Sequence, residues 1–234
     1  MPGSDPPRPG GASELALSAI ETMKPRLRGW LHAGTFPLAV AAGAVLVVLA
    51  PAGPVRGSSA VFAVTAALLF GVSAIYHRGR WSPSVHRVLM RFDHANIFLI
   101  IAGTYTPFTV VLLPRRQGRI LLALIWSGAL LGVALRLLWA NAPRWLFTPV
   151  YIALGWAAVF YLPEFLHSGG PTILTLLIVG GALYSVGGIV YAAQRPNPSP
   201  QWFGFHEVFH AFTLVAFMTH YTAVSMAVYA TPGG

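Results

Sequence analysis

The chain has 234 residues, of which 56% are hydrophobic and only 9% are charged. Soluble domains usually carry about 25% charged residues, so this composition excludes an ordinary soluble protein and favours an integral membrane protein. The net charge of +9 comes from short basic groups beside apolar runs, without the stripe of basic and aromatic residues typical of a nucleic-acid-binding surface.

The first 25 residues are predicted to form a cytoplasmic tail, disordered up to about Ser13. They lack the apolar core and small-residue cleavage site of a signal peptide. Leu15, Ala19 and Met23 then repeat at helical spacing, which indicates either a short interfacial helix or a frayed tail.

Apolar runs of the length that crosses a bilayer, roughly 20 residues, follow one another along the rest of the chain. Short connections rich in proline and glycine separate them, and none is large enough to form a second domain. We therefore predict an all-α membrane protein with one seven-helix transmembrane domain, residues 26–230, and a C-terminal tail, residues 231–234. The predicted spans are 30–50, 58–76, 95–113, 119–139, 146–162, 171–193 and 205–229.

The basic residues predict the orientation of these spans. With the N-terminus in the cytoplasm, eleven of the 15 Lys and Arg residues fall on the cytoplasmic side and four fall outside. The positive-inside rule therefore favours a cytoplasmic N-terminus and an external C-terminus, with the cell membrane as the location. The four external residues are Arg56, Arg115, Arg116 and Arg119.

Polar residues inside predicted spans are costly and are usually functional. Ser73 and His77 lie four apart at the end of the second span, and His206 and His210 lie four apart at the start of the seventh, so each pair shares one helix face. Asp93 lies at the start of the third span. The predicted topology brings all five residues to the cytoplasmic side of the membrane.

Three histidines with one open position form the usual geometry of a catalytic zinc site, and the absence of cysteine leaves histidine as the main choice of ligand. We expect His77, His206 and His210 to bind zinc. Asp93 would hold the metal's water and accept its proton, and Ser73 would hydrogen-bond the water or Asp93.

Each residue also has a structural interpretation. The two histidines of the seventh span can form a hydrogen-bonded pair without a metal. Asp93 can pair with Arg87 or Arg91, or can cap the third span. Ser73 can hydrogen-bond the carbonyl four residues earlier in its own helix.

The segment His206-Glu207-Val208-Phe209-His210 also matches H-E-x-x-H, the zinc motif of metalloproteases. An intramembrane protease would take a further carboxylate ligand from an N-P-D-G or L-D-G motif, and neither string occurs here. Glu207 lies about 100° around the helix from His206, at the entry to the span, where solvent contact is the simple expectation. We therefore predict no role for Glu207 and disfavour a protease.

The remaining histidines are not expected to join the site. His86 and His94 are predicted to lie in or beside a loop, and His32 and His167 near helix ends. His220 lies about 15 Å along the helix from His210 and has no identifiable partner.

Together these motifs resemble the haemolysin III branch of the progestin and adipoQ receptor family, seven-helix membrane proteins related to alkaline ceramidases. The matching pieces are Ser73-x-x-x-His77, Asp93 followed by IIAGTYTPF at 100–108, and Gly204-Phe205-His206-x-x-x-His210. The resemblance implies that the three histidines bind zinc while Ser73 and Asp93 surround the metal's water. It gives Glu207 no role.

Two classes of function remain open. The first is a membrane-embedded zinc hydrolase acting on a lipid amide or ester, with membrane lipids as partners and a role in lipid homeostasis. The second is a non-catalytic protein with structural zinc, either a receptor-like sensor of the membrane or a pore-forming cytolysin. Family members have been linked to lipid-amide hydrolysis, to membrane fluidity and to red-cell lysis.

Overall fold

The computed structural model describes residues 25–139 and 144–231, and the elements within these ranges are helices. An isolated β-bridge joins Ser199 and Phe203, and the described ranges contain no strand. The predicted N-terminal tail, with the spacing of Leu15, Ala19 and Met23, lies outside the described residues except for its last residue.

The helices follow one another with short connections. Their bounds are α2 Trp30–Leu49, α3 Pro54–Arg78, α4 Pro83–Leu112, α5 Arg115–Leu138, α6 Arg144–Gly155, the 3₁₀ helix η1 Trp156–Tyr161, α7 Leu162–Ala193 and α8 Phe205–Tyr229. Six helical stretches of the described chain are long and apolar enough to cross a membrane. The chain is therefore an all-helical, multi-span membrane protein.

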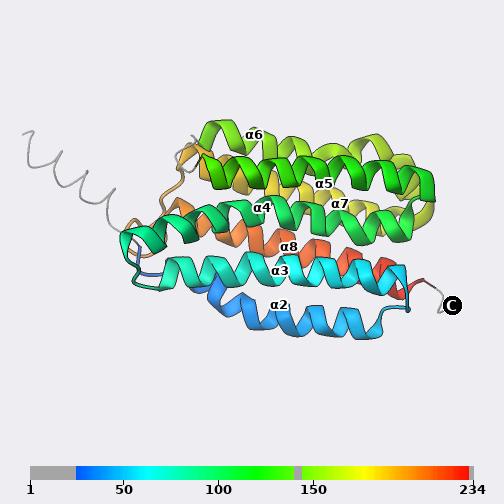
Figure 1. The fold of residues 1–234 in the computed structure, drawn as a ribbon, viewed down its shortest axis with the longest axis horizontal. Coiled ribbons are helices and arrows are strands. Elements are labelled where there is room, and N and C mark those ends of the chain that lie inside the picture. Colours follow the sequence, from blue (N-terminus) through cyan, green and yellow to red (C-terminus); the bar gives the residue numbers. More distant parts are fainter. Residues whose placement is uncertain (1–24, 140–143, 232–234) are drawn as a thin grey trace, which may run out of the picture.

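The predicted spans 146–162 and 171–193 fall within one of these six stretches, Trp145–Ala193, which has 49 residues. The helix breaks inside it at Gly170, whose φ of 72° lies in the region that favours glycine. Figure 1 shows the chain running along α6 and returning along α7, and these two helices pack against each other.

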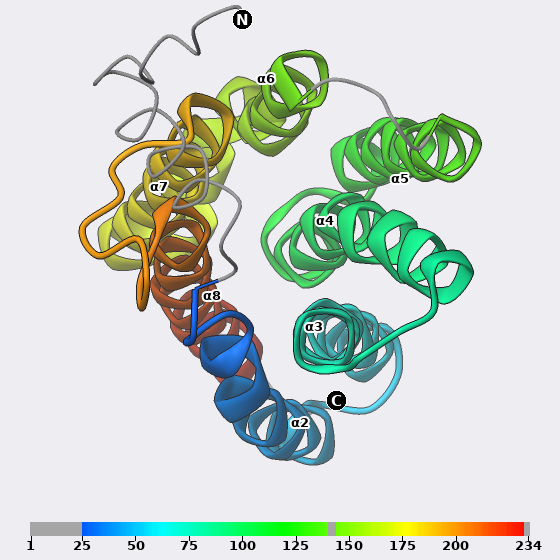
Figure 2. The same ribbon diagram turned by 90° about the vertical axis from the view of Figure 1, so that its left-hand side faces the viewer.

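The helices form a curved wall around a common interior (Figure 2). Consecutive helices from α2 to α5 pack side by side, and α7 packs along α8. Helix α8 closes the arrangement, because it also contacts α2 and α4. As a result, the end of α3 and the beginnings of α2, α4 and α8 meet at one end of the bundle (Figure 1).

The outer surface is apolar, as expected of a surface that faces lipid. Large hydrophobic side chains are widely exposed there, including Val48 at 71%, Phe160 at 81% and Leu138 at 84%. In the interior, many buried hydroxyls bond carbonyls of their own helix. Thr104, for example, donates to the Ile100 carbonyl at 2.7 Å, which satisfies the hydroxyl without an interhelical partner.

Helix α4 begins twelve residues earlier than the predicted third span, at Pro83 instead of residue 95. Ser82 caps it, with its Oγ accepting from the Val85 amide at 3.4 Å, and Pro83 occupies a first-turn position that suits proline. His86 lies in the first turn of α4, beside the connection at 79–82, whereas the prediction that His94 lies in or beside a loop is wrong. The polar segment 83–94 was mistaken for a connection because hydropathy detects membrane crossing and not helix ends.

Tyr105, in the motif at 100–108, ties α4 to the change of helix type after Gly155. Its hydroxyl donates to the Gly155 carbonyl and accepts from the Ala158 amide, both at 2.7 Å. These bonds satisfy backbone groups where α6 gives way to η1, which is important in a medium without water.

Candidate metal centre

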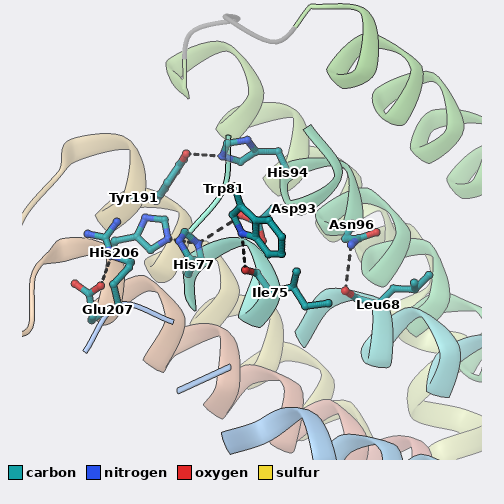
Figure 3. A network of polar contacts seen from close by, with 11 residues as sticks. Leu68, Ile75, His77, Trp81, Asp93, His94, Asn96, Tyr191, His206 and Glu207 are labelled. Atoms are coloured by element: carbon teal, nitrogen blue, oxygen red, sulfur yellow. Dashed lines mark hydrogen bonds and ion pairs between the residues drawn. The ribbon is translucent and has the colours of Figure 1, made fainter. Parts of the chain in front are cut away.

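Two helices bring the three predicted ligands together. His77 lies in the last turn of α3, and His206 and His210 lie one turn apart at the start of α8. All three are buried, and one ligand atom from each lies within 4.8 Å of the others. Figure 3 shows His77 and His206 facing each other at this end of the bundle.

The spacing of this triad suits a transition metal. The Nε2 atoms of His77 and His206 are 3.1 Å apart, close to the separation of about 3.3 Å expected for two imidazoles on a tetrahedral zinc ion. The ring centroids of His206 and His210 are 4.5 Å apart. The buried triad can therefore hold a metal ion, and the all-nitrogen donor set is one that zinc accepts.

The structure brings the two remaining predicted residues to the same place. Asp93 Oδ2 lies 3.7 Å from His77 Nε2, and the Asp93 side chain is 12% exposed. The buried Ser73 hydroxyl lies beside the Asp93 carboxylate without reaching the geometry of a regular hydrogen bond. A carboxylate is thus available next to the triad without belonging to it.

The structural interpretations of Asp93 and Ser73 do not hold among the described residues. Asp93 lies well inside α4, not at its start, so it caps no helix. In the described part of the chain no arginine lies within ion-pair distance of it. The Ser73 hydroxyl does not bond the carbonyl four residues earlier.

Glu207 is buried and paired, which contradicts the prediction of solvent contact. Its side chain is 1% exposed and forms an ion pair with Arg28. Its second oxygen, Oε2, accepts from the Gly204 amide at 2.8 Å and so caps the start of α8. Glu207 therefore fixes the turn that carries His206. The sequence did not predict this role, because the partner of Glu207 in the ion pair, Arg28, lies 179 positions away.

The segment before α2 passes over the site. The amides of Arg26 and Leu27 donate to the carbonyls of Gln201 and Trp202. Gly29 follows with φ of 80°, and a Cβ at this position would lie 2.6 Å from the Cβ of His77. Glycine is needed here both for the left-handed conformation and for the close approach.

His32, which was not expected to join the site, stacks on one of the three predicted ligands. The rings of His32 and His210 lie 3.7 Å apart with an angle of 11° between their planes. Stacked, nearly parallel rings keep their in-plane nitrogen lone pairs in two separate planes, so the two do not converge on one ion. His32 therefore buttresses His210 instead of completing the ligand set.

A second polar layer lies beside the triad. His94 Nε2 and the Tyr191 hydroxyl are 2.9 Å apart (Figure 3), and the Tyr191 ring packs against His206 with centroids 5.8 Å apart. The Tyr151 hydroxyl donates to the His94 carbonyl at 3.2 Å and accepts from Arg136 Nε at 3.3 Å. The one sequence signal near this layer is the family motif formed by Asp93 and the stretch 100–108. His94, Tyr151, Arg136 and Tyr191 are not part of that motif, so the sequence did not predict the layer.

The site opens into a cavity between α4, α6, α7 and α8. The cavity has a volume of about 130 Å³. Ser73, Asp93 and His210 line one end, and apolar side chains such as Ile97 and Ile101 line much of the remainder. A metal held by the triad would therefore face an apolar chamber inside the bundle.

These features define a multi-span helical membrane protein with a buried histidine triad that can hold a metal ion. Residues 20–221 match the model of a family described as Haemolysin-III related. The chain belongs to this family, which confirms the resemblance inferred from its motifs.

Individual relatives agree with this assignment. Hemolysin-3 of Bacillus cereus is 31% identical over 154 residues, which are 66% of this chain and 67% of the relative. The Hemolysin-3 homolog of Bacillus subtilis (strain 168) is 32% identical over 157 residues, 67% and 70% of the two chains. Progestin and adipoQ receptor-like protein 1 of Caenorhabditis elegans is 24% identical over 186 residues, 72% of this chain but 43% of the relative.

Proposed function

We propose that the protein is a zinc-dependent hydrolase embedded in the membrane, acting on a lipid amide or ester. The observation that carries the proposal is a carboxylate, Asp93, 3.7 Å from a histidine of a buried triad that opens into an apolar cavity. A structural zinc site is normally closed by a fourth protein ligand. Among the described residues the group with metal-binding spacing has three members.

Each residue of the site has a separate role in the proposed hydrolysis. His77, His206 and His210 would hold zinc, which when bound supplies a Lewis acid that polarises a carbonyl and acidifies water. Asp93 accepts a proton from the attacking water and passes it to the leaving nitrogen or oxygen. The acyl carbon gains the water's oxygen as its bond to the leaving group breaks. Ser73 lies beside the Asp93 carboxylate and would hydrogen-bond the attacking water or Asp93.

A membrane lipid suits this site better than a soluble substrate. The chamber next to the triad is lined largely by apolar side chains and lies inside a bundle whose outer surface is also apolar. A lipid can enter such a chamber from the bilayer because its acyl chain stays among apolar groups throughout. The transfer of the chain from the bilayer to the chamber therefore costs little hydrophobic free energy.

The same proposal includes seven crossings, a cytoplasmic N-terminus and a triad near the cytoplasmic side of the cell membrane. The 49-residue stretch Trp145–Ala193 is more than twice the roughly 20 residues that one crossing needs, and it breaks at Gly170. Arg28, Arg78 and Arg80 lie at the triad end of the bundle, as the positive-inside rule requires of a cytoplasmic side.

The test is release of fatty acid by the purified, zinc-loaded protein from ceramides, other N-acyl lipids and ester lipids. Asp93→Asn should keep its zinc and lower turnover by about 10²- to 10⁴-fold, the usual contribution of a general base. Glu164→Gln, which changes a carboxylate far from the triad, should turn over like the wild type. If the wild-type protein releases no fatty acid from any of these lipids, the hydrolase proposal is wrong.

A second candidate function is cytolysis, which the name of the Bacillus cereus relative, Hemolysin-3, suggests. A pore does not need the acid–base role of Asp93. Lysis of red cells that is equally strong in the wild type and in Asp93→Asn, without lipid hydrolysis, would favour this candidate. A receptor-like sensor would show neither activity while retaining the metal.

A further inference from the structure

The cavity has a second polar region, well away from the triad. Tyr184 of α7 and His220 of α8 both line it, with ring centroids 5.6 Å apart. His220 is 9% exposed, and the Tyr184 hydroxyl oxygen is fully buried. Both residues belong to the apolar interior of the bundle, where polar groups are uncommon.

Each of these residues keeps a polar atom without a hydrogen-bond partner among the described residues. His220 Nε2 lies 3.1 Å from the Leu177 carbonyl oxygen. A carbonyl only accepts, so Nε2 carries the hydrogen and Nδ1 of the neutral ring is left as an acceptor. His220 Nδ1 and the Tyr184 hydroxyl both lack a described partner. The pair therefore offers an acceptor and a hydroxyl that can donate or accept.

The fold makes room for this pair at a cost. A Cβ at Gly180 would lie 2.2 Å from Cδ2 of His220, so α7 accepts the imidazole only because it has glycine there. Phenylalanine or leucine would fill the same space without leaving a buried polar atom unsatisfied. A ligand group that hydrogen-bonds Nδ1 and the hydroxyl would offset that cost.

The depth of the pair indicates where on a ligand such a group would lie. Tyr191 packs against the ring of His206, and Tyr184 lies two turns further along the same helix. Two turns correspond to about 10 Å along α7. A lipid with its acyl carbonyl at the triad would bring the middle of its chain, not its end, to Tyr184 and His220.

We propose that the cavity selects lipids whose acyl chain carries a hydroxyl group near its middle. The chain hydroxyl donates to His220 Nδ1 and accepts from the Tyr184 hydroxyl. The inference rests on the proposed function only for the position of the acyl carbonyl at the triad, since the hydrogen bonds themselves involve no metal chemistry.

The test compares the binding of stearic acid and of 10-hydroxystearic acid to the purified full-length protein in detergent. Two added hydrogen bonds should give the hydroxylated acid a Kd about five- to tenfold lower in the wild type. Tyr184→Phe, which preserves the ring, should reduce this preference to about twofold or less and leave stearic acid binding unchanged. Tyr229→Phe, on the exposed end of α8, should keep the full preference.

Equal affinities in the wild type, failure of both acids to bind, or an unchanged preference in Tyr184→Phe would each overturn the inference. Asp93→Asn separates it from the proposed function. This variant, which should keep its zinc, should lose hydrolysis and keep the preference for the hydroxylated chain. A wild-type protein that shows the preference but no hydrolysis would contradict the proposed function alone.

Discussion

The two ends of the bundle are held together in different ways. At the triad end, polar side chains join segments far apart in the sequence: Arg28 with Glu207 across 179 positions and His94 with Tyr191 across 97. At the opposite end, Arg56 bonds the Ala50 carbonyl only six positions away, and Gln117 bonds Glu164 across 47. The polar pairs at the triad end therefore join segments farther apart in the sequence than those at the opposite end, where one of the two joins residues of a local turn.

The difference shows where sequence changes should matter. Local turns need little besides their own residues, so they tolerate substitution elsewhere in the chain. The triad end needs several distant segments to be correct at once, because each ligand is positioned by a different neighbour. Paired substitutions at the two ends test this contrast directly.

The largest difference between substitutions at the two ends of the bundle is expected for histidine. Purified protein should contain about one zinc per chain, and His77→Ala, His206→Ala or His210→Ala should each reduce this to near zero, because two imidazoles bind the ion far more weakly than three. His167→Ala, an exposed histidine at the opposite end, should keep full occupancy. Elemental analysis measures the metal, and full retention in all three triad variants would exclude this metal site.

A smaller contrast is expected for glutamate. Glu207→Gln leaves Arg28 without its buried counter-charge and should lower the free energy of unfolding by about 2 to 3 kcal/mol, less than for a fully buried pair because Arg28 is 18% exposed. Glu164→Gln at the other end should cost about 0.5 kcal/mol or less. Unfolding in detergent measures both. Equal losses of unfolding free energy in the two variants would mean that the Arg28–Glu207 ion pair stabilises the fold no more than the Gln117–Glu164 hydrogen bond.

The smallest contrast is expected for glycine. Gly29 lies in the left-handed helical region (φ 80°, ψ −5°), where alanine should cost about 1 to 2 kcal/mol. Gly53 (φ 88°, ψ −140°) lies in a region that only glycine adopts readily, where alanine should cost about 2 to 3 kcal/mol. Only at Gly29 does a Cβ also meet His77, whereas nothing lies within 4 Å at Gly53. Gly29→Ala should therefore weaken zinc binding, whereas Gly53→Ala should lower stability and leave zinc affinity unchanged. A Gly29→Ala protein with normal zinc affinity would contradict this.

The fold could be predicted well where hydropathy governs it. The apolar runs located the helices because a membrane-crossing segment must be long and apolar. The start of α4 was missed because residues 83–94 are polar and continue the helix past the apolar part, although Ser82 and Pro83 are a recognisable capping pair.

The site could be predicted only in part. The i, i+4 spacing placed His206 and His210 on one face, and alternating helix direction brought His77 and Asp93 near them. Nothing local to Glu207 reveals Arg28, because the segment carrying Arg28 reaches α8 through tertiary packing. The stacking of His32 on His210 is hidden for the same reason.

The position of α8 also has a consequence for biosynthesis. His77 is made 129 positions before His206, and α8 leaves the ribosome after α2 and α4, against which it packs. Contacts between such distant segments form late because they require closure of long loops. We therefore expect the helices made before α8 to insert as an incomplete bundle that binds no metal, so that zinc uptake reports that α8 has docked.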